Sequence, residues 1–159
     1  MTEKKFMAAG GRGSVKDKEK LKIVLINLIR NLKEVKYKTE LIKLSFLLDY
    51  LYCKEFSTKE GPTTVEYVKY NYGPYSDAFI DAFNELVQEG ILTEVQLTFG
   101  LGYSIVKDNK KDVDENTGKI LRRVLDGYGR KTLREVKDVI YNTQEFKSAS
   151  FGKAIALNG

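Results

Sequence analysis

The sequence predicts a mainly helical α+β domain with a winged-helix-like centre and flanking N- and C-terminal helices. Apolar residues recur at helical spacing in several separate segments, and residues 91–106 alternate apolar and polar side chains as a β-hairpin does. The resulting order of helix, helix, strand, helix and hairpin is that of a winged helix. With 159 residues, 42% of them hydrophobic, the chain can bury one sizeable core.

The domain boundaries follow from composition. Residues 1–13 lack an apolar segment and are interpreted as a disordered leader, residues 14–143 as one domain, and residues 144–159 as a tail that docks or stays loose. No stretch approaches the roughly 18 apolar residues of a membrane span, and the N-terminus does not have the pattern of a secretory signal. We therefore expect a cytoplasmic location.

Two helices are expected before residue 60. The first opens at Ser14, where residues 14–17 resemble a capping box, and runs to about Val35 with a basic outer face. The second spans about Thr39–Lys54 and is apolar around most of its circumference, which is typical of a helix at the centre of a core. Cys53 on this helix is expected to pack as a small hydrophobe.

The segment 65–72 predicts a strand, because it is rich in β-branched and aromatic residues, and a short helix is the alternative. Its tyrosines are expected to pack around the following Gly73-Pro74 turn, since no arginines alternate with them as they would in a base-stacking surface. Proline fixes its φ near the helical value and lacks an N–H, so we place Pro74 in the first turn of the next helix.

That next helix, ending at Gly90, has two contrasting faces. Its apolar face contains Phe79, Ile80, Phe83, Leu86 and Val87. Its opposite face forms an acidic ridge of Asp77, Asp81, Glu85 and Glu89, without a Lys or Arg on the helix. Carboxylates at this spacing repel one another by a few tenths of a kcal/mol per pair. We interpret the ridge as a surface for a basic protein partner.

The C-terminal third contains a hairpin and two helices. The hairpin tip is expected at Gly100–Gly102, followed by a charged linker over residues 107–115. One helix is expected from about Asp114 to Leu125, with a break at residues 127–129. Thr132 and Glu135 form a capping box that opens the last helix.

Charge is divided by region, with net +6 in residues 1–60, −5 in 61–106 and +4 in 107–159. A winged helix normally meets DNA phosphates with basic residues on the helix and wing, and here both lack them. Nucleic acid would have to contact the first helix or the basic C-terminal residues Arg122, Arg123, Arg130, Lys131 and Arg134. A DNA-binding regulator that uses these flanks, as a homodimer, is the alternative hypothesis.

Catalysis and metal binding find little support. The chain has no histidine, which excludes His-based triads and His zinc ligands. The carboxylates of the ridge are about 6 Å apart per helical step, too far for all four to share one ion. We therefore predict no enzyme activity, no metal and no cofactor.

Three segments resemble one family. Lys43-Leu44-Ser45-Phe46-Leu47-Leu48-Asp49 is similar to its K-L-x-[YF]-L-x-D helix, and the aromatic run 67–76 is similar to its Gly-Pro turn. Residues 120–129 and 132–136 resemble its C-terminal helix pair. This family is the SocA-like Panacea-domain antitoxins, and the turn also resembles small YwgA-type prokaryotic proteins. The resemblance implies an antitoxin that neutralises a cognate toxin by direct contact.

The expected sites follow from these patterns. The partner-binding residues predicted are Tyr70, Tyr72, Gly73, Pro74, Tyr75, Asp77, Asp81, Glu85 and Glu89. Lys43 and Asp49 match the family motif. Because a buried charge is seldom left unpaired, we expect Asp49 to pair with a base inside the fold.

Overall fold

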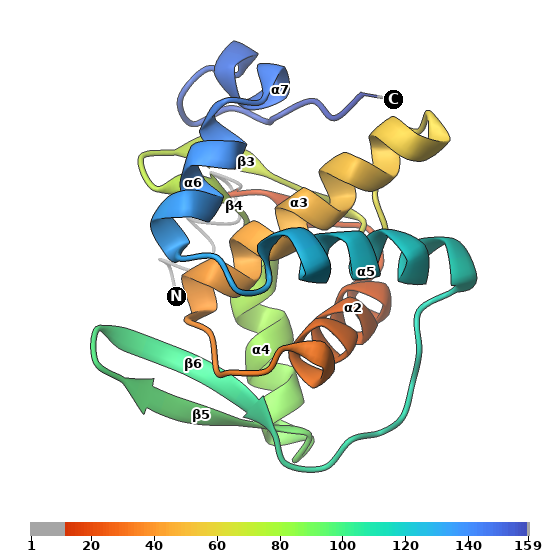
Figure 1. Cartoon of the computed structure of the whole chain (residues 1–159), viewed down its shortest axis with the longest axis vertical. Coiled ribbons are helices and arrows are strands. Elements are labelled where there is room, and N and C mark those ends of the chain that lie inside the picture. Colours follow the sequence, from red (N-terminus) through yellow and green to blue (C-terminus); the bar gives the residue numbers. More distant parts are fainter. Residues whose placement is uncertain (1–11, 159) are drawn as a thin grey trace, which may run out of the picture.

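The computed structural model describes residues 12–158 and confirms the mainly helical α+β class. Its elements in chain order are β1 (Ser14–Val15), α2 (Lys18–Asn31), α3 (Lys38–Phe56), β2 (Val65–Glu66), β3 (Val68–Tyr70), β4 (Gly73–Tyr75), α4 (Ala78–Gln88), β5 (Leu92–Leu97), β6 (Gly100–Ile105), α5 (Glu115–Tyr128), α6 (Leu133–Tyr141) and α7 (Gln144–Ser148). Helix α3 is the central element, as predicted, and α2, α5, α6 and the β3–β4 hairpin pack around it (Figure 1).

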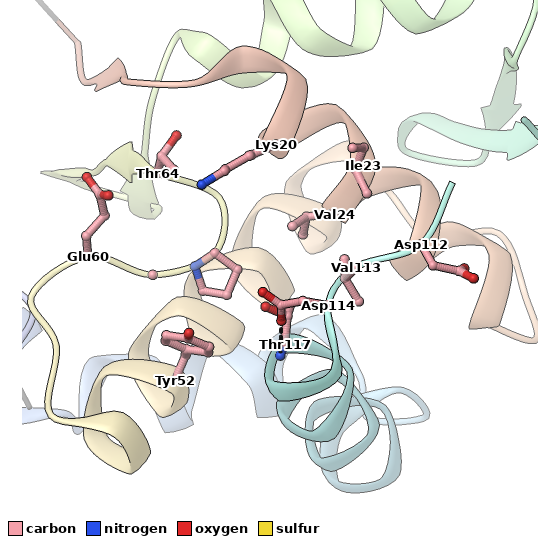
Figure 2. Close-up of a pocket in the computed structure, with 12 residues that line it drawn as sticks. Lys20, Ile23, Val24, Tyr52, Glu60, Thr64, Asp112, Val113, Asp114 and Thr117 are labelled. Carbon is pink, nitrogen blue, oxygen red and sulfur yellow. Dashed lines mark hydrogen bonds between the residues drawn. The ribbon is translucent and has the colours of Figure 1, made fainter. Parts of the chain in front are cut away.

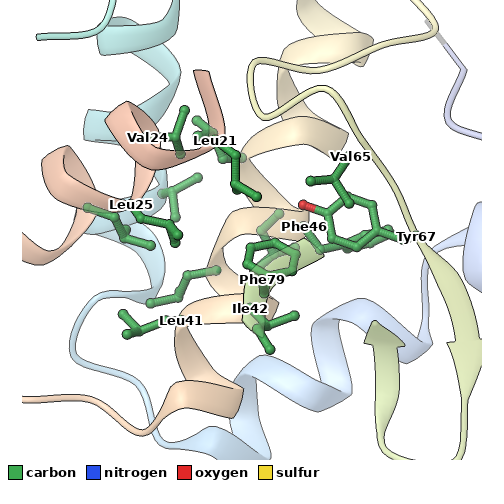
Figure 3. Close-up of a cluster of buried hydrophobic side chains, with 14 of the residues drawn as sticks. Leu21, Val24, Leu25, Leu41, Ile42, Phe46, Val65, Tyr67 and Phe79 are labelled. Atoms are coloured by element: carbon green, nitrogen blue, oxygen red, sulfur yellow. The ribbon is translucent and has the colours of Figure 1, made fainter. Parts of the chain in front are cut away.

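The core lies where α2, α3 and α4 meet (Figure 3). Leu25 of α2, Phe46 of α3 and Phe79 of α4 are all fully buried, and the ring of Tyr67 meets that of Phe46 edge to face. Cys53 is fully buried among these apolar side chains, which confirms its predicted packing. Within residues 12–158, none of the helices combines the length and apolar character needed to cross a membrane.

Helix α2 begins later than the sequence predicts. Residues 14–15 pair antiparallel with residues 65–66 and form a strand instead of a helical turn. Asp17 is the N-cap, and its carboxylate accepts a hydrogen bond from the Lys20 N–H at 3.2 Å. The helix ends at Asn31, also earlier than expected. The local capping signal was misleading because the strand finds its partner 50 residues away in the chain.

The Gly-Pro segment is a strand, so its predicted place in the first turn of a helix is wrong. β4 pairs antiparallel with β3, and the predicted strand 65–72 is divided into β2 and β3 at Tyr67. Gly73 has φ +118°, a conformation that favours glycine. Pro74 lies in a two-stranded sheet where a missing N–H is tolerated. Helix α4 begins only at Ala78, with Asp77 as its N-cap.

The hairpin tip also lies elsewhere than predicted. β5 and β6 pair from Leu92 with Ile105 to Leu97 with Gly100, so the turn is at residues 98–99. Gly102 lies inside β6, where an added Cβ would be 2.4 Å from the Lys36 carbonyl oxygen. Glycine at this position permits a close backbone approach, and the sequence pattern alone did not separate that role from a turn.

The C-terminal part keeps most of its predicted elements. Asp114 caps α5, accepting from the Thr117 N–H at 2.7 Å, and α5 continues through Gly127 to Tyr128, so the break comes later than predicted. The capping box of Thr132 is confirmed at the start of α6. The charged linker before α5 is held by Arg30.

The tail docks. After α7 it runs along β3, where the Lys69 N–H donates to the Lys153 carbonyl at 3.0 Å and the Ile155 N–H donates to the Tyr67 carbonyl at 2.8 Å. Ile155 and Leu157 are buried in the core. Of the predicted leader, residues 1–11 lie outside the described residues.

Candidate functional site

A pocket of about 400 Å³ lies between the start of α3 and the β3–β4 hairpin. The tyrosines and Gly-Pro residues expected to bind a partner line it together with Lys43 of the helix motif. Lys43 and the Gly73-Pro74 segment, about 30 residues apart in the sequence, therefore meet at one place. We call this cavity the tyrosine pocket.

The walls of the tyrosine pocket are aromatic. The ring of Tyr70 lies 6.0 Å from that of Tyr75 and 5.6 Å from that of Phe151, measured between centroids. The guanidinium of Arg12 lies 5.9 Å from the centre of the Tyr70 ring. Tyr72 is 77% exposed and Phe151 61% exposed at the rim. Two large aromatic side chains that line the pocket are thus presented to solvent.

Gly73 lets Lys43 reach this pocket. A Cβ added at Gly73 would lie 3.2 Å from Lys43 Cε and 3.3 Å from Nζ, tighter than an ordinary contact. Any side chain here would also have to adopt φ +118°. The hairpin is held in place from α6, where the Tyr141 hydroxyl donates to the Asn71 carbonyl at 3.1 Å.

Lys43 is the unusual charge of the site. Only 4% of this residue is exposed, yet no carboxylate among residues 12–158 forms an ion pair with its ammonium. Burial and, to a smaller extent, the nearby charge of Lys137 lower the pKa of Lys43 to about 8, against a smaller opposing effect of Glu40. The ammonium is therefore held in a place that disfavours its charge.

Asp49, the other motif residue, has a structural environment. It is fully buried and accepts hydrogen bonds from the Thr63 N–H at 3.0 Å, the Thr63 hydroxyl and the Tyr67 hydroxyl at 2.7 Å. These partners are neutral, so the expected pairing with a base is wrong. Burial raises the pKa of Asp49 to about 6. An added Cβ on Gly61 would lie 2.3 Å from Asp49 Oδ1, which shows how closely this turn is packed against α3.

The acidic ridge is not a bare negative surface. Lys22 of α2 pairs with Glu89 at 2.7 Å and with Glu85 at 3.3 Å, and Lys18 also pairs with Glu85. At the other end of the ridge, Arg12 lies 3.7 Å from Asp77. Asp81 is exposed and has the charge of Lys18 nearby.

Basic residues of the same chain thus reduce the repulsion between the carboxylates of the ridge. Lys18 and Lys22 of α2 balance the charges of Glu85 and Glu89 across the α2–α4 interface. The sequence could not show this, because the lysines that meet the carboxylates are more than 60 residues away. These contacts weaken the electrostatic reason for assigning a basic partner to the ridge, which stays a prediction.

The basic residues of the alternative hypothesis remain on the surface. Arg122, Arg123, Arg130, Lys131 and Arg134 are all exposed on α5, α6 and the turn between them. Arg123 pairs with Glu55 at 3.1 Å. Arg30, on the first helix, is bound to Asp108 and Asp112.

A second cavity, of about 300 Å³, opens between α2, the turn before β2 and the start of α5 (Figure 2). Its three carboxylates have partners: Asp114 caps α5, Glu60 pairs with Lys16 at 2.9 Å and Asp112 pairs with Arg30 at 2.8 Å. None of its lining residues is a buried charge. We therefore take the tyrosine pocket as the candidate site.

Sequence patterns missed part of this site. Lys38, Thr39 and Ile42 line the pocket from the first turns of α3, and Phe151 reaches it from the tail. The four-residue spacing of Lys38 and Ile42 and of Thr39 and Lys43 could have placed these side chains on one face of the helix. The contribution of Phe151 depends on the docking of the tail and has no local signal.

Comparison of the chain with protein-family models, with curated proteins and with solved structures finds no match.

Proposed function

We propose that the chain is a non-enzymatic, cytoplasmic protein-interaction module of antitoxin type, which binds a partner polypeptide at the tyrosine pocket. The observation that carries the proposal is the pair of exposed aromatic side chains, Tyr72 and Phe151, at the rim of a cavity with aromatic walls. Aromatic side chains beside a pocket are the residues that most often dominate the energy of protein interfaces.

The resemblance to the SocA-like Panacea antitoxins agrees with this proposal. Lys43 and the Gly73-Pro74 strand, which carry the resemblance, lie at the same pocket. Asp49 fastens the turn before β2 and the hydroxyl of Tyr67, the first residue of the aromatic run. The motif residues therefore either line the pocket or support the chain segment that leads to it.

The test uses the product of the neighbouring reading frame as the candidate partner. The double variant Tyr72→Ala with Phe151→Ala should weaken binding about 10- to 100-fold in calorimetric titration, the range typical of lost aromatic anchors. Phe99→Ala is the matched control, because Phe99 is 89% exposed at the tip of the β5–β6 hairpin, outside the pocket. Equal affinity of the double variant, the control and the unaltered chain would refute the proposal.

The second candidate function is DNA binding through the exposed basic residues of α5 and α6. Their exposure favours it, and they lie on one continuous helix–turn–helix segment, residues 122–134. This function predicts that the affinity for duplex DNA falls steeply as the salt concentration rises. It also predicts that the double variant Arg122→Ala with Arg130→Ala lowers that affinity. The double aromatic variant should leave such binding unchanged, so the two functions are separable.

A further inference from the structure

The buried lysines differ in whether a carboxylate lies within ion-pair distance. Within residues 12–158, three lysines are buried: Lys22, Lys36 and Lys43. Lys22 has three carboxylates within ion-pair distance, and Lys36 lies 3.1 Å from Glu34. Lys43 alone of these three has none. Removing an ammonium from water without a counter-ion costs free energy. The fold therefore bears this cost at Lys43.

Glu40, the nearest acidic residue to Lys43 on α3, interacts with other groups. Glu40 accepts a hydrogen bond from the Tyr37 N–H at 3.0 Å as part of the cap of α3, and it lies 3.9 Å from Lys36. The acid is thus already bound to other donors. On the other side of Lys43, Lys137 of α6 adds positive potential. The interior of the tyrosine pocket is therefore electropositive.

We infer that Lys43 is the counter-ion for one carboxylate of the partner, which enters the tyrosine pocket together with an adjoining apolar or aromatic group. This inference rests on the proposed function and names the chemistry that the partner presents. The carboxylate belongs either to an Asp or Glu side chain or to a chain end, since both offer the same group.

A single carboxylate fits better than a phosphate. Lys43 is the one deeply buried cation among the described residues that line the pocket, and Arg12 already lies against Asp77 and the Tyr70 ring. One ammonium balances one negative charge. The remaining lining is mostly apolar, with Ile42, Pro74 and Ile80 beside the tyrosines, which suits the carbon skeleton that carries the carboxylate.

Folding has already removed Lys43 from water, so an incoming carboxylate meets a desolvated and fixed partner. The interaction of two charges is stronger in such surroundings than on an exposed surface. Lys38, at the rim and half-exposed, does not have this advantage. The two lysines of the pocket should therefore contribute unequally.

Binding should depend on pH through Lys43. The charged and titratable groups around it are Lys38 and Glu40 on α3, Lys137 and Tyr141 on α6, and Arg12, Tyr70, Tyr72 and Tyr75 around the hairpin. Burial and Asp77 raise the pKa of Tyr75 to about 12, and burial raises that of Tyr141, so these phenols stay neutral where Lys43 loses its proton. Affinity for a carboxylate should fall as pH rises through about 8.

The experiment titrates the full chain with small probes and follows the backbone amides of Gly73 and Tyr75 by NMR. N-acetyl-phenylalanine tests a chain-end carboxylate, and N-acetyl-glutamyl-phenylalanine amide tests a side-chain carboxylate. N-acetyl-phenylalanine amide is the neutral control. We expect at least one acid to bind, with at least tenfold higher affinity than the neutral amide at pH 7, and at least tenfold loss of that affinity at pH 9.5.

The variants are Lys43→Met, which keeps the length of the side chain, and Lys38→Met as the control at the rim. Lys43→Met should lose at least tenfold in affinity for the acid, and Lys38→Met less than threefold. Equal binding of acid and amide, equal binding by Lys43→Met and the unaltered chain, or no binding of either acid would overturn the inference.

The same variants separate this inference from the proposed function. If Tyr72→Ala with Phe151→Ala loses the protein partner while Lys43→Met binds it normally, the carboxylate inference fails and the proposed function stands. If the acid probes bind through Lys43 but the aromatic variant keeps full affinity for the partner, the proposed function fails and the carboxylate site stands.

Discussion

Lys22 and Lys43 are equally buried, each with 4% of its surface exposed, but their pKa values shift in opposite directions. Lys22 lies between three carboxylates, whose hydrogen bonds outweigh burial and raise its pKa above the ordinary value. Lys43 forms no ion pair with a carboxylate within residues 12–158, and its pKa falls to about 8. Burial alone thus does not tell a structural charge from a recognition charge, whereas the presence of an internal partner does.

Replacing Lys22 should give the largest effect on stability. Lys22→Met removes the charge that joins α2 to Glu85 and Glu89 and leaves the carboxylates of α4 to repel one another. A buried pair broken on one side costs about 3–5 kcal/mol, but these carboxylates can rehydrate, so we expect a loss of about 2–3 kcal/mol in the free energy of unfolding.

Urea denaturation measures this loss. Lys20→Met is the matched control, because Lys20 is exposed on the same helix and its side chain has no ion pair in the described part of the chain. It should change stability by less than about 0.5 kcal/mol. If both variants unfolded at the same urea concentration, Lys22 would not be the structural charge that the comparison requires.

Asp49 is a third kind of buried ionisable group, since its hydrogen-bond partners are all neutral donors. Its pKa is raised from 3.8 to about 6, so the folded state binds the proton more tightly than the unfolded state. Stability from this group is greatest below about pH 4 and is lost as pH rises to about 6. Between pH 4.5 and 7 the loss should be about 2 kcal/mol.

Asp49→Asn should remove this slope while keeping one acceptor oxygen, which can serve the Thr63 N–H, and the amide nitrogen can then donate to the Thr63 and Tyr67 hydroxyls. Asp108 acts in a lower range, because Arg30 lowers its pKa to about 2, so its contribution is lost only as pH falls from about 4 to about 2. Urea denaturation of both chains at pH 4.5, 5.5 and 7 checks the prediction. A slope that persists in the Asn variant would assign it to other groups.

Replacing Lys43 should give the smallest effect, and one of opposite sign. Lys43→Met removes a buried charge that has no ion pair within residues 12–158 and fills the same space, so we expect the free energy of unfolding to rise by about 1 kcal/mol at pH 7. Because burial lowers the folded-state pKa of Lys43 from 10.5 to about 8, the unaltered chain gains stability as pH rises across this interval. The advantage of the Met variant should shrink there, as thermal or urea unfolding at pH 7 and 9.5 would show.

Local patterns were sufficient for the fold class and for the existence of α2 to α6, but they missed α7 and misplaced the starts of α2 and α4. The apolar circumference of α3 and the capping box of Thr132 both correspond to what the structure contains. Patterns failed where a distant segment decided the outcome. The strand at residues 14–15 depends on residues 65–66, and the Gly-Pro strand depends on its pairing with β3. In each case tertiary pairing overrode a signal that favoured a helix start.

The candidate site also has features that local sequence predicts and features that depend on distant segments. The tyrosines and the Gly-Pro residues were predicted together and lie together, since they are neighbours in the chain. The acidic ridge was found correctly as a set of carboxylates on one face, but its lysine partners come from another helix. The significance of Lys43 could not be seen before the structure, because a sequence does not state which buried charges lack a partner.

The docked tail has a consequence for how the chain tolerates shortening. Its residues occupy the outer edge of β3, where the backbone of Lys69 both donates to Lys153 and accepts from Gly152. Loss of the chain from about residue 150 onward would remove one wall of the pocket and expose that strand edge in the same event. Unpaired edges recruit other strands, so a molecule cut at this point should self-associate more than the intact chain does.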